Sequence, residues 1–156
     1  MSSVIEYQHM LEGEEAEVSA LVLDVFNEFV AHEFSAEGLR EFSRYAEPSQ
    51  LLSRSKENHF CLVAVSENKP VGMVEVRDNN HISLLFVAKD YMGQGIAREL
   101  MHQALAICQE NNPELEVVDV NSSTYAVKIY EKLGFKVAGA SEEKNGIIFV
   151  PMKLEV

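Results

Sequence analysis

The segment LLFVAKDYMGQGIAREL joins an apolar run to two closely spaced glycines and the start of an amphipathic pattern. Gly93 and Gly95 permit backbone conformations that bring the chain close to a ligand. The N–H groups in the first turn of a following helix lack intrahelical partners, and the helix dipole adds partial positive charge there. The combination predicts an anion-binding loop, most naturally for a pyrophosphate.

Other interpretations of these glycines compete with this one. A tight turn between a strand and a helix would need the same residues, and this alternative stays open. A P-loop is excluded because the chain contains no Gly-x-x-x-x-Gly-Lys. A dinucleotide-binding fingerprint would need Gly or Ala at Arg98, although Asp119 lies roughly where the ribose-binding acid of such a fold would stand. A nucleotide-binding domain of another kind is therefore a weak alternative.

Two motifs resemble those of one protein family. MGQGIA resembles the acyl-CoA pyrophosphate loop of the GNAT superfamily of N-acetyltransferases, whose pattern is Gln/Arg-x-x-Gly-x-Gly/Ala followed by a helix. Gly95 and Ala97 match its small positions, whereas Met92 stands where the family usually has Gln or Arg. NSSTYAVKIYEKLGF is similar to the family's other cofactor motif, a helix ending in Tyr-Glu-Lys-Leu-Gly-Phe. The motifs occur in the family's order and spacing.

The resemblance implies one acetyl-CoA-dependent N-acetyltransferase domain over residues 1–156, with acetyl-CoA as acyl donor and an amine as acceptor. It implies an α/β fold with a mixed, mostly antiparallel sheet, a parallel central strand pair and helices on both faces, the N-terminal helices overhanging the acceptor pocket. The strand from His81 to Val87 would splay from its neighbour and bind pantetheine through its backbone. The implied cofactor-binding residues are Leu85, Phe86, Val87, Met92, Gly93, Gln94, Gly95, Ile96, Ala97, Arg98, Asn121, Ser123 and Tyr130.

Tyr130 stands at the position that resembles the family's general acid, near the sulfur of coenzyme A. It also lies on an apolar stripe with Ala126, Ile129 and Leu133, so helical periodicity alone favours a tyrosine of the core. The resemblance favours the acid. Tyr125 precedes Tyr130 by more than a helical turn, and we expect it to face elsewhere.

Glu75 and His81 are the candidates for the general base that takes a proton from the acceptor amine. His81 aligns approximately with the position where some family members carry a catalytic carboxylate, and histidine titrates near neutral pH. Alternation along a strand would place His81, Ser83, Leu85 and Val87 on one face, aimed at the acyl site. Because His81 follows Asp-Asn-Asn, capping of a turn is the alternative role.

Hydrophobic periodicity predicts the elements that position these residues. Pro48 is expected to stop the second helix, SENKP is typical of a hairpin turn, and Gly134 of a helix end. A strand, a helix and a strand around the glycine loop imply a parallel strand pair. The expected elements are strand 5–9, helices 15–34 and 36–45, strands 60–65, 71–76 and 82–88, helix 96–111, strand 115–120, helix 124–133, and strands 135–139 and 147–153.

Composition narrows the class of protein. With 156 residues and 47% hydrophobic content, the chain can bury a core without cross-links, and Cys61 and Cys108 are expected to be buried free thiols. The formal charge of −12 disfavours nucleic acid as a partner. It could steer a cationic amine to the protein, although solubility alone accounts for it. The N-terminal sequence lacks a signal-peptide pattern and no apolar run is long enough for a bilayer, so we expect a cytoplasmic protein without membrane association.

Two function classes remain compatible with the sequence. A non-catalytic acyl-CoA-binding sensor or regulatory module would carry the same motifs, but the tyrosine at position 130 favours an enzyme. The five histidines show no zinc-helix spacing, and no Gly-x-Ser-x-Gly elbow occurs. Direct attack of the amine in a ternary complex is therefore the simpler mechanism. The acceptor, the acyl-chain preference and the oligomeric state stay open, with a homodimer as one option.

Overall fold

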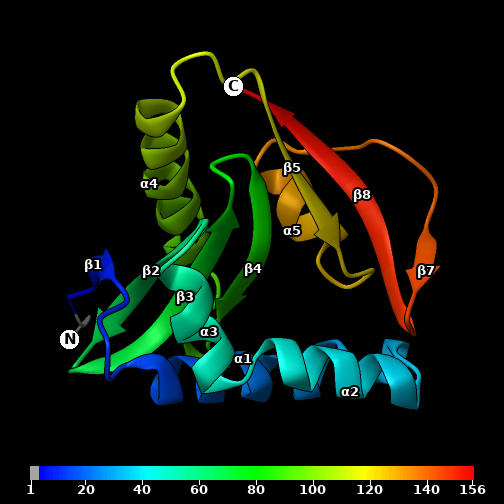
Figure 1. Ribbon diagram of the computed structural model, residues 1–156, viewed down its shortest axis with the longest axis horizontal. Helices are drawn as coiled ribbons and strands as arrows, with labels where there is room; N and C mark the ends of the chain where they lie inside the picture. Colours follow the sequence, from blue (N-terminus) through cyan, green and yellow to red (C-terminus); the bar gives the residue numbers. More distant parts are fainter. Residues whose placement is uncertain (1–3) are drawn as a thin grey trace.

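Three consecutive strands form the centre of the sheet in the computed structural model, which describes residues 4–156 (Figure 1). They are β2 (His59–Ser66), β3 (Lys69–Arg77) and β4 (His81–Val87), and neighbours pair antiparallel. Glu67 and Asn68, between β2 and β3, adopt positive φ values of 51° and 64°. Two such residues in succession are typical of a tight hairpin turn, so the turn predicted from SENKP is confirmed.

The remaining strands extend this meander on both sides. They are β1 (Glu6–His9), β5 (Val117–Ser122), β6 (Lys136–Val137), β7 (Glu142–Lys144) and β8 (Ile147–Glu155). The strand order is β1-β2-β3-β4-β5-β8-β6, and β7 pairs with β8. β4 and β5 run parallel, whereas the other described pairs are antiparallel. The predicted mixed sheet with a parallel central pair is confirmed.

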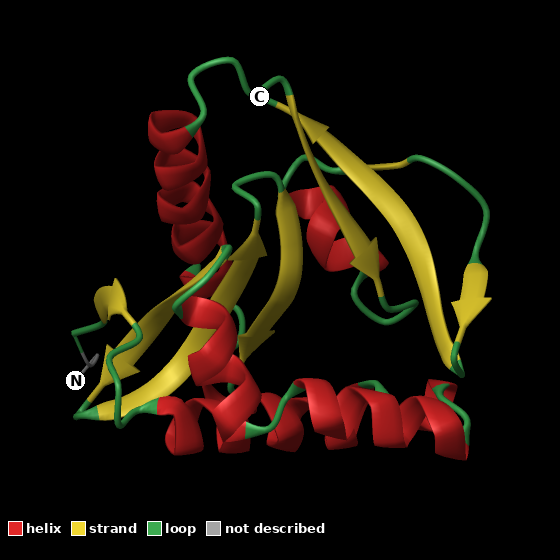
Figure 2. Ribbon diagram, in the orientation of Figure 1, coloured by secondary structure: helices red, strands yellow, loops and turns green. Residues whose placement is uncertain are grey.

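Helices cover both faces of the sheet (Figure 2). They are α1 (Glu15–Phe29), α2 (Ala36–Tyr45), α3 (Pro48–Ser55), α4 (Ile96–Asn111) and α5 (Val127–Lys132), with short 3₁₀ helices η1 (Ala31–Glu33) and η2 (Lys89–Tyr91). Leu100 of α4 and Tyr130 of α5 pack into the core cluster on one face. Val22 of α1 and Leu51 of α3 pack into the cluster on the other face. Each fully buried aliphatic side chain stabilises the fold by about 1.5–3 kcal/mol.

Helix α3 begins at Pro48, where the sequence pattern predicts an end of helical structure. Proline has no N–H, and its fixed φ suits the first helical position, where an N–H would have no partner. The same residue type is thus compatible with a helix stop and a helix start. α1 is also shorter than expected, because Val30 leaves the helical region with a φ of −121° and the chain continues as η1.

The C-terminal strands were predicted to form one hairpin between residues 135–139 and 147–153. The structure divides the first arm into β6 and β7, which pair with β8 at separate places. The β7–β8 turn packs against α2, where Gly38 and Gly146 approach so closely that a Cβ on Gly38 would collide with the Gly146 carbonyl. This contact joins the end of the sheet to the N-terminal helices.

β4 and β5 are paired at two positions, His81 with Asp119 and Ile82 with Val120. Beyond Ile82 the two strands diverge (Figure 1), although β4 stays paired with β3 as far as Val87. The splayed strand that the family resemblance implied is confirmed. Backbone groups of β4 that face the gap must find other partners.

Within residues 4–156, none of the helices combines the length and the apolar character that crossing a membrane requires. The two cysteines of the chain are free and buried, as expected.

Candidate acetyl-transfer site

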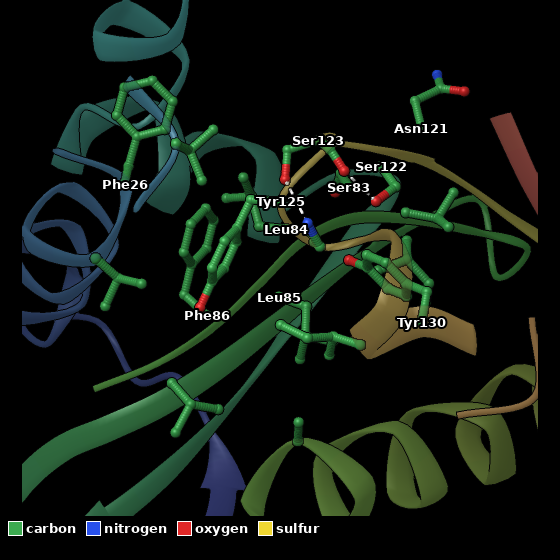
Figure 3. Close-up of a pocket in the computed structure, with 18 of the residues that line it drawn as sticks. Phe26, Ser83, Leu84, Leu85, Phe86, Asn121, Ser122, Ser123, Tyr125 and Tyr130 are labelled. Atoms are coloured by element: carbon green, nitrogen blue, oxygen red, sulfur yellow. Dashed lines mark hydrogen bonds between the residues drawn. The ribbon is translucent and has the colours of Figure 1, made fainter. Parts of the chain in front are cut away.

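A cavity of about 940 Å³ lies where β4 and β5 diverge and reaches α1 and α2 (Figure 3). Most of the residues singled out in the sequence contribute to its wall. Those on the wall are His81, Leu85, Phe86, Val87, Met92, Gly93, Gly95, Ile96, Ala97, Arg98, Asn121, Ser123 and Tyr130. Glu75 and Gln94 are outside the wall.

The glycine loop forms one end of this cavity. Gly93 and Gly95 adopt positive φ values of 78° and 83°, and a Cβ added to either would have no neighbour within 4 Å. The Glu99 N–H donates to the Gly95 carbonyl at 3.0 Å as α4 begins. The three N–H groups of residues 96–98 therefore precede the intrahelical bonds. The loop combines open space with unpaired donors, which is the geometry of an anion site.

The side chains of His81 and Asp119 form a hydrogen-bonded pair at the first of the two positions where β4 and β5 are paired. The His81 Nδ1 and the Asp119 Oδ1 are 2.6 Å apart. The His81 side chain is 11% exposed, whereas that of Asp119 is 50% exposed. A carboxylate that accepts from Nδ1–H leaves Nε2 as the nitrogen able to take a proton. The sequence indicates Asp119 only as a candidate ribose ligand, and nothing local in it indicates the pairing with His81.

Glu75, the other candidate base, lies behind the cavity wall and is 1% exposed. Its Oε1 accepts from the Tyr45 Oη at 3.0 Å, from the Ser83 Oγ at 2.8 Å and from the Arg54 Nη2 at 3.4 Å. Its Oε2 accepts from the Arg54 Nε at 3.1 Å. A carboxylate has about four lone-pair sites. Oε1 accepts three of these hydrogen bonds and Oε2 accepts one, and the burial of the side chain keeps a substrate from the remaining site on Oε2.

The residues around Glu75 join four elements of the fold. Arg54 of α3 lies over the ring of Tyr45 of α2, with 3.6 Å between the guanidinium carbon and the ring centroid. Burial, and after it the charge of Glu75, raises the pKa of Tyr45, so its hydroxyl stays protonated and donates. Tyr45, Ser83 and Arg54 line the cavity. Sequence reasoning missed Tyr45 and Arg54, and it named Ser83 only as a member of a strand face; α3 itself was not predicted.

β4 does not alternate as predicted. Its register with β3 shifts because Ser83 is an extra residue, a β-bulge. Leu85 and Val87 pack against the core cluster of α4, whereas Ser83 bonds to Glu75. The prediction that Ser83 shares a face with Leu85 and Val87 is therefore wrong. The bulge brings the Ser83 hydroxyl to the Glu75 cluster.

Tyr130 belongs both to the core and to the cavity wall (Figure 3). It is 5% exposed and its ring contacts Phe135 edge-on, with centroids 5.4 Å apart. Burial raises the pKa of its hydroxyl, which is therefore protonated at neutral pH and able to donate. Tyr125 was expected to face elsewhere, but it also lines the cavity, and its ring stacks on Phe29 at 5.1 Å.

A carboxylate bridges the N-terminal helices and the β5–α5 loop. Glu33 of η1 accepts from the backbone N–H groups of Thr124 at 3.1 Å and Tyr125 at 3.2 Å. These hydrogen bonds supplement the stacking of Phe29 on Tyr125. In the part of the chain that the structure describes, no cluster of three His, Cys, Asp or Glu side chains could hold a metal ion.

Comparisons with known proteins agree with this geometry. The sequence profile described as the Acetyltransferase (GNAT) domain matches residues 30–156. The peptidyl-lysine N-acetyltransferase YjaB of Salmonella typhimurium is 34% identical over 112 residues, which cover 71% of this chain and 70% of the relative. The chain belongs to the GNAT acetyltransferase family. It is an N-acetyltransferase that uses acetyl-CoA as its acyl donor.

Two further similarities concern the fold and one part of the chain. The structure of the PaiA N-acetyltransferase from Thermoplasma acidophilum in complex with coenzyme A superposes with a TM-score of 0.79 at 20% identity, covering all of both chains. The N-acetylaspartate synthetase of Xenopus tropicalis is 37% identical over 86 residues, which cover 51% of this chain and 32% of the relative. The first similarity supports the fold. The second concerns about half of this chain, and the name of that relative refers to N-acetylaspartate, an acetylated amino acid.

Replacement of Gly95 by valine should abolish coenzyme A binding while the domain stays folded. A branched residue is strained at a φ of 83°, and its side chain would project into the open space over the loop. Binding can be measured by isothermal titration calorimetry and folding by circular dichroism. Tight coenzyme A binding by the folded variant would show that the loop does not hold the pyrophosphate.

Replacement of Arg54 by methionine should destabilise the domain by about 3–5 kcal/mol, because it leaves the Glu75 carboxylate buried without its cation. The matched control is Arg44→Met, which removes an exposed ion pair with Glu41 and should cost at most about 1 kcal/mol. Urea unfolding measures both. The added change Glu75→Gln should recover part of the loss. Equal stabilities of the two single variants would contradict the role given to the Glu75 cluster.

Proposed function

We propose that the acceptor is a primary amine that attacks acetyl-CoA directly in a ternary complex, with His81 as general base and Tyr130 as general acid. The observation that carries the proposal is the 2.6 Å contact of His81 with Asp119 on the cavity wall. A carboxylate that orients an imidazole is a common arrangement for a base. Glu75 then serves as a positioning residue, since it is buried behind the cavity wall and its carboxylate is held by Arg54 and Tyr45.

The cofactor would extend along the gap between β4 and β5. Its pyrophosphate would accept hydrogen bonds from the backbone at Gly93–Arg98, where donors and helix dipole coincide. Its pantetheine arm would pair with the backbone of Leu85 and Val87, which no longer pairs with β5. The Val87 N–H would then face the thioester oxygen. Tyr130, across the gap on α5, would lie near the sulfur.

The reaction needs one group that accepts a proton from the amine and another that gives a proton to the departing thiolate. An alkylamine with a pKa of about 10.4 is protonated at pH 7, and its deprotonation costs about 4.6 kcal/mol. His81 would accept this proton first, and the neutral amine would then attack the thioester carbon. As the C–S bond of the tetrahedral intermediate breaks, the Tyr130 hydroxyl would protonate the departing thiolate, and the second proton of the attacking nitrogen would restore that hydroxyl. The proton on His81 passes to solvent. The products are an acetylated amine and coenzyme A.

Replacement of His81 by alanine should lower kcat/KM for the amine at pH 7 by about 10²- to 10⁴-fold, the usual contribution of a general base. The deficit should shrink as pH rises, because more of the amine is already neutral. The pH–rate profile measures both effects. His59→Ala is the control, since His59 lies on β2 outside the cavity wall. A His81→Ala profile that coincides with the parent's would make solvent water the base.

Replacement of Tyr130 by phenylalanine should lower kcat by about 10²- to 10⁴-fold with little change in KM for acetyl-CoA. The ring and its packing on Phe135 are kept, so the fold should survive. Tyr125→Phe, on the same cavity, is the control. Steady-state and single-turnover kinetics with unfolding curves measure the outcome. An unchanged kcat with chemistry rate-limiting would return Tyr130 to a purely structural role.

A further inference from the structure

The cavity wall is cationic although the chain is acidic. The chain has 25 Asp and Glu residues against 13 Lys and Arg residues. Among residues 4–156, the charged side chains on the wall are one acid, Glu41, and five cations, which are Arg44, Arg54, Arg77, Arg98 and Lys132. The average charge of the protein is therefore a poor guide to the ligand of this cavity.

The five cations divide between two ends of the cavity. Arg98 in the first turn of α4 and Lys132 in α5 lie in the cofactor motifs. The others, Arg44, Arg54 and Arg77, come from α2, α3 and β3. Arg77 is the register partner of His81. Three arginines thus lie at the acceptor end, each with a carboxylate within 4 Å.

The ion pairs of these arginines leave donors free. Arg54 uses Nε and Nη2 for Glu75, and Arg44 uses Nη1 for Glu41. Arg77 is 48% exposed and approaches Asp78 at 3.8 Å, which is longer than a hydrogen bond. A guanidinium has five N–H donors, arranged to bind a carboxylate through two parallel hydrogen bonds. Arg77 is the least committed of the three.

We propose that the acceptor is a small amine that carries a carboxylate, that is, a compound of the amino-acid class. Its amine would face His81 and its carboxylate would bind Arg77, whose guanidinium donors are the least committed. This inference rests on the acetyl transfer proposed above. The half-buried aromatic residues Phe34, Phe42 and Phe86 supply an apolar wall beside this polar corner. A polyamine, which the net charge of the chain would attract, is disfavoured by Arg77, which no carboxylate holds at hydrogen-bond distance in the described residues.

Matched pairs of acceptors separate this proposal from acetyl transfer in general. A series of α- and ω-amino acids, each with its amide, is assayed with acetyl-CoA, and kcat/KM is measured by thiol release and product mass. At the best chain length the acid should exceed its amide by about ten- to a hundredfold, the effect expected of charged hydrogen bonds. Loss of the carboxylate makes the neighbouring amine less basic, which favours the amide, so basicity does not explain a preference for the acid.

Two variants test the residue assigned. Arg77→Gln should reduce the acid-to-amide ratio to nearly one. Arg40→Gln, a change at an exposed arginine of α2 outside the wall, should keep the ratio of the parent. Equal rates for acids and amides in the parent, or faster acetylation of a lysine peptide lacking carboxylates, would overturn the inference while acetyl transfer stands. If coenzyme A binds but no amine of any kind is acetylated, the proposed function itself fails.

Discussion

β4 and β5 stop pairing after Ile82 and Val120, although both strands continue. A sheet that opens in its middle leaves a row of backbone donors and acceptors without partners, and such groups must be satisfied by something. In the proposed complex the amide-containing arm of the cofactor takes the place of the missing strand. The same divergence creates the cavity and brings α5 opposite β4. His81 and Asp119 lie one residue before the point where it begins.

The bulge at Ser83 is the second constraint, and it connects the opening to the N-terminal helices. By adding one residue to β4, it brings a hydroxyl to the Glu75 cluster, where Tyr45 and Arg54 also bond. A buried carboxylate with four donors is stable only while all of its partners stay in place. α2 and α3 are therefore fixed on the sheet by a polar cluster as well as by apolar packing, and the acceptor end of the cavity gains a defined shape.

Features with local signals were predictable from the sequence, and features that depend on distant contacts were not. The glycine loop, the hairpin turn and the long α4 each follow from residues that are neighbours in the chain. The pairs His81–Asp119 and Arg54–Glu75 join residues 38 and 21 positions apart, and no periodicity reports them. α2 ends at Tyr45, as predicted, but α3 was missed because proline is compatible with a helix start as well as with a helix stop. The arginines on the cavity wall were missed because net charge averages over surfaces that the fold separates.

The hydrogen bonds of Glu33 limit how segments of related proteins can be exchanged to change the acceptor preference. Thr124, whose N–H it accepts, lies 91 residues further along the chain, so a crossover anywhere in between assigns the two sides of the bridge to different parents. If the N-terminal helices come from a parent without an acid at position 33, the N–H groups of Thr124 and Tyr125 lose their hydrogen-bond acceptor just before α5. In a chimeric library of this domain, residues 29–33 and 123–126 should therefore come from the same parent, although the two segments are distant in the sequence.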